Sequence, residues 1–415
     1  MEDRDPAAID AARERALERI VDLTLAAGSV GAVTDKYFTH TATVARRTGD
    51  ARVTYAVFLR RRVLAALEPA LRLLRRLVPD AEVRRFHDEG AVVPAERKLM
   101  EISGRFSELS EVETLLLQVV GLPCVCADNA RQMCLAVSHA AFMDMHARHG
   151  AGPQMNLLAS YGAAVGSRRA QAEGAKGFIG SSQDITAPFF GREKGMGTMP
   201  HSLVGYAGGD VLEALKMFAR EIPDARTLVA LVDYEGREVD DALRCAEWFY
   251  REARLHEKGR SFGVRLDTHG GRFCQGLDYE RSVETVGAWL DVEGEYAIVE
   301  QVLGERASAL DTDSILVDRV RRHLFGAGVS AAAIMHMRKA LDAAGFPEAA
   351  IVASSGFGPQ KCHVVGAVRA PVDLIGTGSF LPGKYHETYA TADVIAYDGT
   401  QRVKTGREFL LKRPE

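Results

Sequence analysis

Short apolar runs that end in small or polar residues recur beyond residue 155, and they constrain the fold more than any other feature. Five of them begin beyond residue 155, namely GFIGSSQ, TLVALVDYE, SFGVRLDTHGG, AAIVASSGF and VDLIGTGSF. Helical patterns lie between them at 238–258, 278–291 and 330–345. This alternation is typical of parallel strands joined by crossover helices. We therefore predict an α/β fold with functional groups at the carboxyl ends of the strands.

The first 150 residues have a different pattern. The apolar periodicity predicts a helix at 6–27, an extended stretch at VGAVTDKYFTHT, a strand leading into an amphipathic helix over 55–77, short strands at 94–104, and helices at 110–123 and about 125–149. The last residues read as short strands. We expect an N-terminal α+β domain at 1–154, an α/β barrel at 155–382, and a tail at 383–415 that packs back on the N-terminal domain.

Composition excludes several classes of protein. The chain has 415 residues, 26% of them charged and 47% hydrophobic, with a formal charge of −4. These values exclude a collagen-like, disordered or disulfide-dense chain and give no indication of nucleic acid or a membrane as partner. There is no CxxC pair, no uninterrupted run of about 18 apolar residues, and the N-terminus is acidic and polar. We expect a cytoplasmic protein with reduced, buried cysteines.

Two glycine-rich strand ends are candidate phosphate-binding loops. SSGFG (354–358) follows the run AAIVA, and GTGS (376–379) follows VDLI. Small residues let backbone N–H groups approach a phosphate, and serine or threonine hydroxyls add donors. Barrels often bind phosphate after their last two strands. The alternative is a pair of tight strand-to-helix turns without a ligand.

The run VRLDTHGGR (264–272) brings two charged residues to one face of a strand. Arg265 and Asp267 are two positions apart, so their side chains point in the same direction. Burying them is costly unless they are paired or bind a ligand. Asp267 is suited to Mg²⁺-pyrophosphate or a ribose hydroxyl, and Arg265 to an anion. A structural ion pair is the alternative.

Three further polar residues stand in small-residue contexts. His201 lies in the loop GMGTMPHS, where an imidazole can act as a base, a phosphate contact or a nucleophile. Arg168 and Arg169 follow a glycine and a serine, and a guanidinium binds carboxylates and phosphates through two hydrogen bonds. The alternatives are a hydrogen-bonded structural histidine and two arginines on a helix surface.

Aromatic and histidine pairs give weaker signals. Tyr37 and Phe38 in TDKYF are candidates for stacking on an aromatic substrate, and core aromatics are the alternative. His146 and His149 lie three apart in a predicted helix, but no third metal ligand is evident, so we interpret them as surface histidines. The common P-loop, GxGxxG, HExxH and GxSxG motifs do not occur.

The motifs, in their order, resemble those of the nicotinate phosphoribosyltransferase family over nearly the whole chain. They are TDKYF near residue 35, SEVETLLLQ near 114, GSRRAQAEGAKGFIGSSQDITAPFFGREKGMGTMPHS at 166–202, VDYEGREVDDALRCAE at 232–247, VRLDTHGGR at 264–272, SSGFGPQK at 354–361 and GTGSFLP at 376–382. The resemblance implies the type II phosphoribosyltransferase fold, an irregular, TIM-like α/β barrel beside an N-terminal α+β domain. It also implies a homodimer or higher homo-oligomer.

The resemblance further implies a reaction. Nicotinate displaces pyrophosphate from C1 of phosphoribosyl pyrophosphate to give nicotinate mononucleotide, with Mg²⁺ as cofactor and ATP as co-substrate. It implies that His201 is phosphorylated, Arg168 lies near the nicotinate carboxylate, Tyr37 stacks on the pyridine ring, and Asp267 binds the metal beside Arg265. The other implied site residues are Arg169, Gly197, Thr198 and Ser202 around the substrate, and Ser354, Ser355, Gly356, Gly376, Thr377 and Gly378 around the 5′-phosphate.

One stretch departs from the family pattern. Many members read Asp-Ser-Gly-Asp after the strand arginine, whereas this chain reads Asp267-Thr268-His269-Gly270-Gly271. The second carboxylate is missing, and His269 is a candidate to replace part of its contacts. The change motivates the hypothesis of an inactive family member with a binding or regulatory role. The retained His201, Arg168 and phosphate loops favour an enzyme.

The choice of pyridine depends on one charge. Nicotinate carries a carboxylate that needs an arginine, whereas nicotinamide prefers neutral or acidic partners. Arg168 and Arg169 therefore favour nicotinate over nicotinamide or another pyridine. The quinolinate-specific relative usually has a shorter chain and more basic residues facing the substrate, and it lacks the histidine block GTMPHS.

Overall fold

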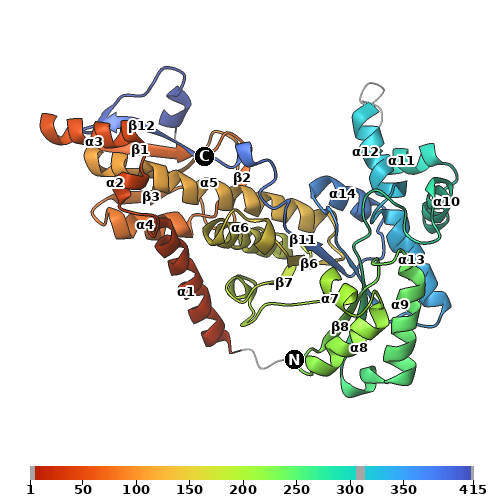
Figure 1. Cartoon of the computed structure of the whole chain (residues 1–415). Helices are drawn as coiled ribbons and strands as arrows, with labels where there is room; N and C mark the ends of the chain where they lie inside the picture. Colours follow the sequence, from red (N-terminus) through yellow and green to blue (C-terminus); the bar gives the residue numbers. More distant parts are fainter. Residues whose placement is uncertain (1–4, 305–313, 413–415) are drawn as a thin grey trace. The chain divides into compact units, whose positions relative to one another are not determined.

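The computed structural model describes residues 5–304 and 314–412, and contacts divide the chain into two compact units (Figure 1). The first unit comprises Met1–Gln132, Asp144–Gly195 and Gly378–Glu415. The second comprises Met133–Met143 and Met196–Thr377.

The division does not fall at residue 155, where the change in sequence pattern predicts a boundary. Helix α6 (Pro153–Ala172) packs against α5 (Phe106–Ala136) within the first unit. A Cβ atom at Gly162 would lie 2.3 Å from the carbonyl oxygen of Pro123, so the two backbones touch at a point that only glycine permits. This contact places α6 with the N-terminal part of the chain.

The first unit is built on an antiparallel sheet with the strand order β13-β12-β1-β5-β3. Its strands are β1 (Arg52–Phe58), β3 (Glu82–Arg85), β5 (Lys98–Arg105), β12 (Thr391–Tyr397) and β13 (Thr400–Gln401). The tail therefore lies beside β1, where Phe58, Ile395 and Leu410 share a buried apolar cluster. Two short strands, β2 (Val63–Leu64) and β4 (Val92–Val93), form a separate antiparallel pair.

The N-terminal helix α1 (Pro6–Leu25) confirms the helix predicted there and packs against α4 (Glu68–Leu77). Arg72 of α4 binds the carboxylates of Glu14 and Glu18, and its side chain is 13% exposed. Because a guanidinium that is this enclosed needs its anions, the two contacts fix how α1 lies on α4.

The extended stretch predicted around residues 30–41 is wrong, because this segment forms α2 (Val30–Val33) and α3 (Lys36–Thr48). Valine, threonine and aromatic residues favour strands, but that preference yields to tertiary contacts. Here Thr34, between the two helices, donates a hydrogen bond to the carbonyl oxygen of Glu111 at 2.6 Å.

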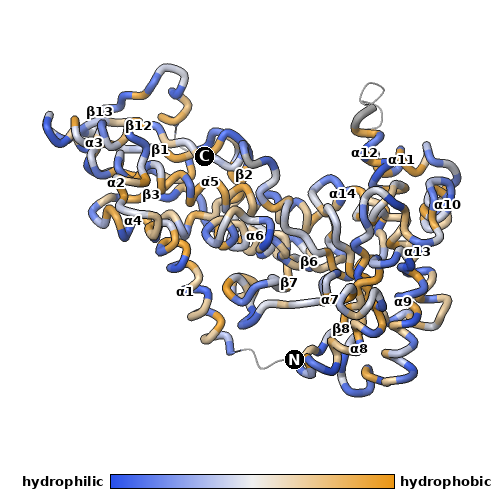
Figure 2. Tube along the Cα trace, viewed as in Figure 1, coloured by the Kyte–Doolittle hydropathy of each residue, from blue (hydrophilic) through white to orange (hydrophobic). Residues whose placement is uncertain are grey.

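A single helix, α5, takes the place of the two helices predicted at 110–123 and 125–149, and it ends at Ala136. Within the described residues it is the one helix long and apolar enough to cross a membrane, with a mean hydropathy of 1.5 over an 18-residue window. That window is 78% buried inside the chain, so α5 has both the apolar composition and the burial of a core helix (Figure 2).

Strand β6 (Ala141–Asp144) replaces the end of the predicted second helix. All four of its residues are buried, and a strand buried on both faces shows no alternation that distinguishes it from a buried helix.

The prediction of a surface position for His146 is also wrong. Its side chain is 1% exposed, and Nδ1 lies 2.9 Å from the carbonyl oxygen of Gly378.

The helix predicted over 55–77 is interrupted, because β1 continues to Phe58 and α4 begins only at Glu68. The three consecutive arginines between them lie in the turn before β2, where Arg61 binds Glu387 at 3.0 Å. All six cysteines are free and buried, as predicted.

The second unit contains a parallel sheet in which β6, β11, β10, β9 and β8 follow one another. Its later strands are β8 (Thr227–Leu231), β9 (Ser261–Leu266), β10 (Ala350–Ala353) and β11 (Leu374–Thr377). Its helices are α7 (His201–Tyr206), α8 (Val211–Glu221), α9 (Glu238–Glu247), α10 (Tyr279–Leu290), α11 (Glu295–Leu303), α12 (Ser314–Phe325), α13 (Ala331–Ala343) and α14 (Pro359–Ala367). A further predicted strand, β7 (Phe178–Ser181), follows α6 in the first unit. The predicted alternation and α/β fold class are confirmed.

Candidate functional site

The predicted site residues are shared between the two units. Tyr37, Arg168, Arg169 and Gly378 belong to the first. The second holds Gly197, Thr198, His201, Ser202, Arg265, Asp267, Ser354, Ser355, Gly356, Gly376 and Thr377. Most of this second set lies at strand ends or in the loop before α7, whereas Tyr37 and the two arginines are carried on helices.

Arg265 and Asp267 lie at the carboxyl end of β9, with side chains 12% and 19% exposed. Arg265 Nη1 donates a hydrogen bond to Thr198 Oγ1 at 2.6 Å. Asp267 Oδ1 accepts one from Ser354 Oγ at 2.9 Å, and Ser354 follows the neighbouring strand β10. The nearest N and O atoms of Arg265 and Asp267 are 3.9 Å apart. Arg265 and Asp267 therefore do not form a tight, isolated ion pair. Through their hydrogen bonds they connect the end of β9 to the segments that carry Thr198 and Ser354.

The loop at 354–358, between β10 and α14, has the backbone of an anion-binding loop. Ser355 and Gly356 have φ angles of +71° and +74°, which turn the chain sharply. Among the residues that the structure describes, the backbone N–H groups of 355–358 donate no hydrogen bond. Phe357 and Gly358 are nevertheless buried. Buried N–H groups nearly always have a partner, so these donors are suited to an anion.

Two protein groups hold the carbonyl oxygens of the same loop. Lys361 Nζ donates to the Ser355 carbonyl at 2.7 Å, and Thr377 Oγ1 donates to the Phe357 carbonyl at 2.7 Å. Thr377 ends the neighbouring strand β11, so both glycine-rich strand ends shape one loop. Sequence reasoning missed Lys361. The signal was present in SSGFGPQK, where a lysine stands three residues after the loop.

Gly376 and Gly378 flank Thr377, and all three residues are buried. A Cβ atom at Gly378 would lie 2.5 Å from the backbone of Met145 and of His146. Close packing of two chain segments therefore accounts for glycine at position 378. The contact predicted between these residues and a 5′-phosphate stays a prediction.

His201 opens helix α7, and its imidazole is 44% exposed. Its Nε2 atom lies 3.0 and 3.1 Å from the two carboxylate oxygens of Asp233, which is buried directly beyond β8. A carboxylate at this distance accepts a hydrogen bond from Nε2–H, which leaves the lone pair on Nδ1. Asp233 was missed from sequence, although it follows the apolar run TLVALV as Asp267 follows its own.

The stretch that departs from the family pattern is held by a buried carboxylate. Glu238 is fully buried and accepts hydrogen bonds from Thr268 Oγ1 at 2.9 Å and from the Gln275 backbone N–H at 3.0 Å. Arg272 Nη1 lies 2.6 Å from the same carboxylate. His269 is exposed, and its Nδ1 accepts a hydrogen bond from its own loop. Thr268 therefore helps to hold the loop that follows β9, through its hydrogen bond to Glu238.

A magnesium ion fits this strand end only with help from a substrate. No group of three or more metal-ligating side chains occurs within 5–304 and 314–412. Asp267 offers one carboxylate, and Mg²⁺ is commonly bound by one or two carboxylates together with waters and substrate phosphates. Asp267 is therefore a suitable ligand for a metal that arrives with a pyrophosphate group.

The two adjacent arginines on α6 have different surroundings. Arg169 forms an exposed ion pair with Glu173 at 2.6 Å, one turn further along the helix. Arg168 Nη1 instead lies 3.5 Å from the Phe189 carbonyl, and surrounding protein lowers the pKa of its guanidinium although the side chain still reaches solvent. Crowding by protein likewise raises the pKa of nearby Glu89 to about 7. Arg168 is thus the arginine with donors available to a ligand.

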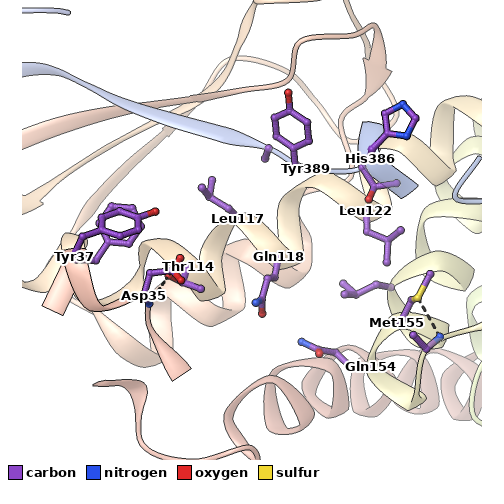
Figure 3. A pocket seen from close by; sticks show the side chains of 15 residues that line it. Asp35, Tyr37, Thr114, Leu117, Gln118, Leu122, Gln154, Met155, His386 and Tyr389 are labelled. Carbon is purple, nitrogen blue, oxygen red and sulfur yellow. Dashed lines mark hydrogen bonds between the residues drawn. The ribbon is translucent and has the colours of Figure 1, made fainter. Parts of the chain in front are cut away.

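Tyr37 lies in the first turn of α3 and is 62% exposed, so the alternative of a core aromatic is wrong. Its ring centroid is 4.2 Å from that of Phe38. Both rings border a cavity of about 600 Å³ within the first unit (Figure 3). Gln118 of α5 and Tyr389 of the tail also line this cavity. The stacking role of Tyr37 stays a prediction.

Comparison with known proteins agrees with this architecture. Residues 35–124 match the family model described as the N-terminal domain of quinolinate phosphoribosyl transferase. Nicotinate-nucleotide pyrophosphorylase from Pyrococcus furiosus is similar in structure, with a TM-score of 0.63 and 22% identity over 91% of this chain and 78% of that one. Human nicotinic acid phosphoribosyltransferase has a TM-score of 0.56 and 18% identity over 90% and 76%. The chain has the type II phosphoribosyltransferase fold.

A third structure with this fold, the nicotinate-nucleotide pyrophosphorylase of Francisella tularensis, has a TM-score of 0.50 and 13% identity, over 88% of this chain and 95% of that one. No curated protein sequence matched significantly. These solved structures therefore establish the fold. Their names give two different activities, nicotinate-nucleotide pyrophosphorylase and nicotinic acid phosphoribosyltransferase.

Proposed function

We propose that this protein is a phosphoribosyltransferase that forms nicotinate mononucleotide and pyrophosphate from nicotinate and phosphoribosyl pyrophosphate, in a reaction coupled to ATP. The observation that carries the proposal is the 354–358 loop, whose backbone donors lack partners, next to Asp267 and Arg265 at the end of the adjacent strand. A phosphorylated ribose offers both an anion for the loop and a pyrophosphate for the charged pair.

The chemistry requires alignment and charge stabilisation more than a strong base. The pyridine nitrogen forms a bond to C1 of the ribose as the bond between C1 and the pyrophosphate oxygen breaks, and the pyrophosphate leaves with the electron pair. A pyridine lone pair needs no deprotonation, so this displacement requires no general base. Arg265, held by Thr198, stabilises negative charge on the leaving group. Mg²⁺ bound to Asp267 would neutralise pyrophosphate charge.

His201 and Asp233 support the coupling to ATP. With the Nε2 proton held by Asp233, Nδ1 carries the lone pair that attacks the γ-phosphorus of ATP. The Nδ1–P bond forms as the bond between the γ-phosphorus and the bridging oxygen breaks, and ADP leaves. An imidazole that is 44% exposed is accessible to such a co-substrate.

Arg168 supports a pyridine with a carboxylate, because its guanidinium makes one long contact with Phe189 and no ion pair among the described residues. Quinolinate is a second candidate substrate, favoured by the match of residues 35–124 to the quinolinate phosphoribosyl transferase N-terminal domain. The presence of His201 with its aspartate favours nicotinate.

The test is product formation from phosphoribosyl pyrophosphate and Mg²⁺ with nicotinate, nicotinamide or quinolinate, each with and without ATP. Formation of nicotinate mononucleotide, faster with ATP, is the expected result. A product from quinolinate or nicotinamide alone would replace the substrate. Absence of turnover with every pyridine, together with loss of Mg²⁺-dependent binding of phosphoribosyl pyrophosphate, would support an inactive family member.

A further inference from the structure

Lys361 is a buried cation that the proposed reaction does not use. It stands in the first turn of α14 with 7% of its surface exposed. Its Nζ atom donates to the Ser355 carbonyl at 2.7 Å and lies 4.2 Å from the centre of the Phe357 ring. Among the described residues it makes no ion pair. Burying an ammonium without an anion is costly, so an anion at this place would relieve that cost.

The hydrogen bond to Ser355 also sets the direction of a loop amide. In a trans peptide the C=O and the following N–H point in opposite directions. With the Ser355 carbonyl directed at Lys361, the N–H of Gly356 points in the opposite direction, away from Lys361, and Gly356 is exposed. The +71° φ angle of Ser355 is unusual for a residue with a side chain, so the backbone is strained at this point of the loop.

We propose that Lys361 is a positioning residue of the 354–358 loop. Its hydrogen bond to Ser355 orients the loop, and its positive charge favours the binding of a sugar phosphate there. This inference rests on the proposed function, because that function places a phosphorylated ribose at the loop. Lys361 acts through the backbone of the loop, so it would discriminate between ligands by their phosphate group and leave recognition of the pyridine unchanged.

The charged groups around Lys361 define how its effect depends on pH. Burial lowers the pKa of Lys361 to about 8. Asp267, beyond β9, opposes this shift, as does the Cys362 thiol on α14. His323 of α12 is kept neutral at neutral pH, because burial and nearby cations, Lys361 among them, lower its pKa to about 4. A bound phosphate raises the pKa of Lys361, so binding takes up a proton near pH 8 and weakens as pH rises from 7 to 9. The second phosphate ionisation lies near pH 6 and does not interfere.

The experiment is calorimetric binding of ribose 5-phosphate to the full chain and to Lys361→Met, at pH 7 and at pH 9. We expect the variant to bind about 10- to 100-fold more weakly at pH 7, since it loses both the hydrogen bond that orients the loop and the buried positive charge beside it. Its affinity should not depend on pH in this range. Lys361→Arg should keep part of the affinity. Lys339→Met, which removes an exposed lysine from α13, is the matched control and should bind as the unmodified protein does.

Steady-state kinetics provide a second readout. Lys361→Met should raise the KM for phosphoribosyl pyrophosphate and leave the KM for the pyridine within about twofold. Unchanged affinity for ribose 5-phosphate in Lys361→Met would overturn the inference while leaving the proposed function intact. Binding that depends on Lys361 without turnover of any pyridine would reject the function and retain the inference. If Lys361→Met does not fold, proton uptake by the unmodified protein at pH 8 decides, and its absence overturns the inference.

Discussion

The two units arrange their candidate functional groups in different ways. In the second unit, Arg265 at the end of β9 is hydrogen-bonded to Thr198 in the loop before α7. Asp267, also at the end of β9, is hydrogen-bonded to Ser354 at the end of the adjacent strand β10. In the first unit, Tyr37 and Arg168 project from helices, and each reaches solvent with few polar contacts. The strand-end group is therefore organised before a ligand binds, whereas the helix-borne group has side-chain freedom to lose on binding.

This difference predicts where substitutions have the greatest consequence. Groups held by the backbone and by each other act on developing charge with little reorganisation, and each is costly to remove. Exposed side chains on helices contribute a contact that a ligand must order, so each is worth less. Variants in the two units should therefore separate effects on the chemical steps from effects on substrate affinity.

The largest expected effect is that of His201→Ala, which should abolish the stimulation of the reaction rate by ATP. The imidazole is the group that would carry the phosphoryl group, so a slow reaction independent of ATP should persist. Asp233→Asn should lower the stimulation, because the amide no longer favours a proton on Nε2. Rates with and without ATP measure both, with exposed His40→Ala as control. Equal stimulation of His201→Ala would refute the assignment.

Asp267→Asn should lower kcat/KM for phosphoribosyl pyrophosphate by about 10²–10³-fold, the order expected when one group that stabilises transition-state charge is lost. The change keeps the shape of the side chain and a partner for Ser354. Rates over a range of Mg²⁺ concentration measure the loss. Asp291→Asn is a matched control, since Asp291 is exposed with a φ angle of +57° that asparagine tolerates. A loss below about threefold would remove Asp267 from the metal site.

The strand-end group was also the part that could best be predicted from the sequence. Short apolar runs that end in Ser, Gly, Thr or Asp place Arg265, Asp267 and the 354–358 loop correctly, because parallel strands bring their carboxyl ends to one edge. The same rule applies to Asp233, which was missed because no role was assigned to the aspartate in the motif at 232–247, although it follows the run TLVALV. Lys361 was missed because its role depends on a side chain that folds back on the preceding loop.

The first unit was harder to predict for physical reasons. Residues 30–48 have strand-forming side chains but form helices through contacts such as that of Thr34 with Glu111. Strand β6 lacks alternation because both of its faces are buried. The packing of α6 on α5 depends on Gly162 touching the backbone of α5, and sequence periodicity does not report such a contact.

Arg168→Ala should raise the KM for nicotinate about 10- to 100-fold, as expected when a charged hydrogen-bond donor to a carboxylate is removed. The KM for nicotinamide, which lacks the carboxylate, should change much less. Arg169→Ala serves as the neighbouring control. Its arginine is engaged with Glu173 at the surface, so its loss should change the KM by about twofold or less. Equal effects of the two substitutions would show that neither arginine selects the carboxylate.

The smallest effect should come from Tyr37, which is 62% exposed. Tyr37→Leu should raise the KM for nicotinate about 2- to 10-fold, because an aromatic pair contributes about 0.5–1.5 kcal/mol beyond its buried area. Tyr37→Phe should keep the affinity, since stacking requires the ring and not the hydroxyl. Tyr296→Leu replaces a similarly exposed tyrosine on α11 and should leave the KM unchanged. If Tyr37→Leu instead lowers kcat by as much as Asp267→Asn does, the helix-borne group is as organised as the strand-end group, and the contrast between the two units fails.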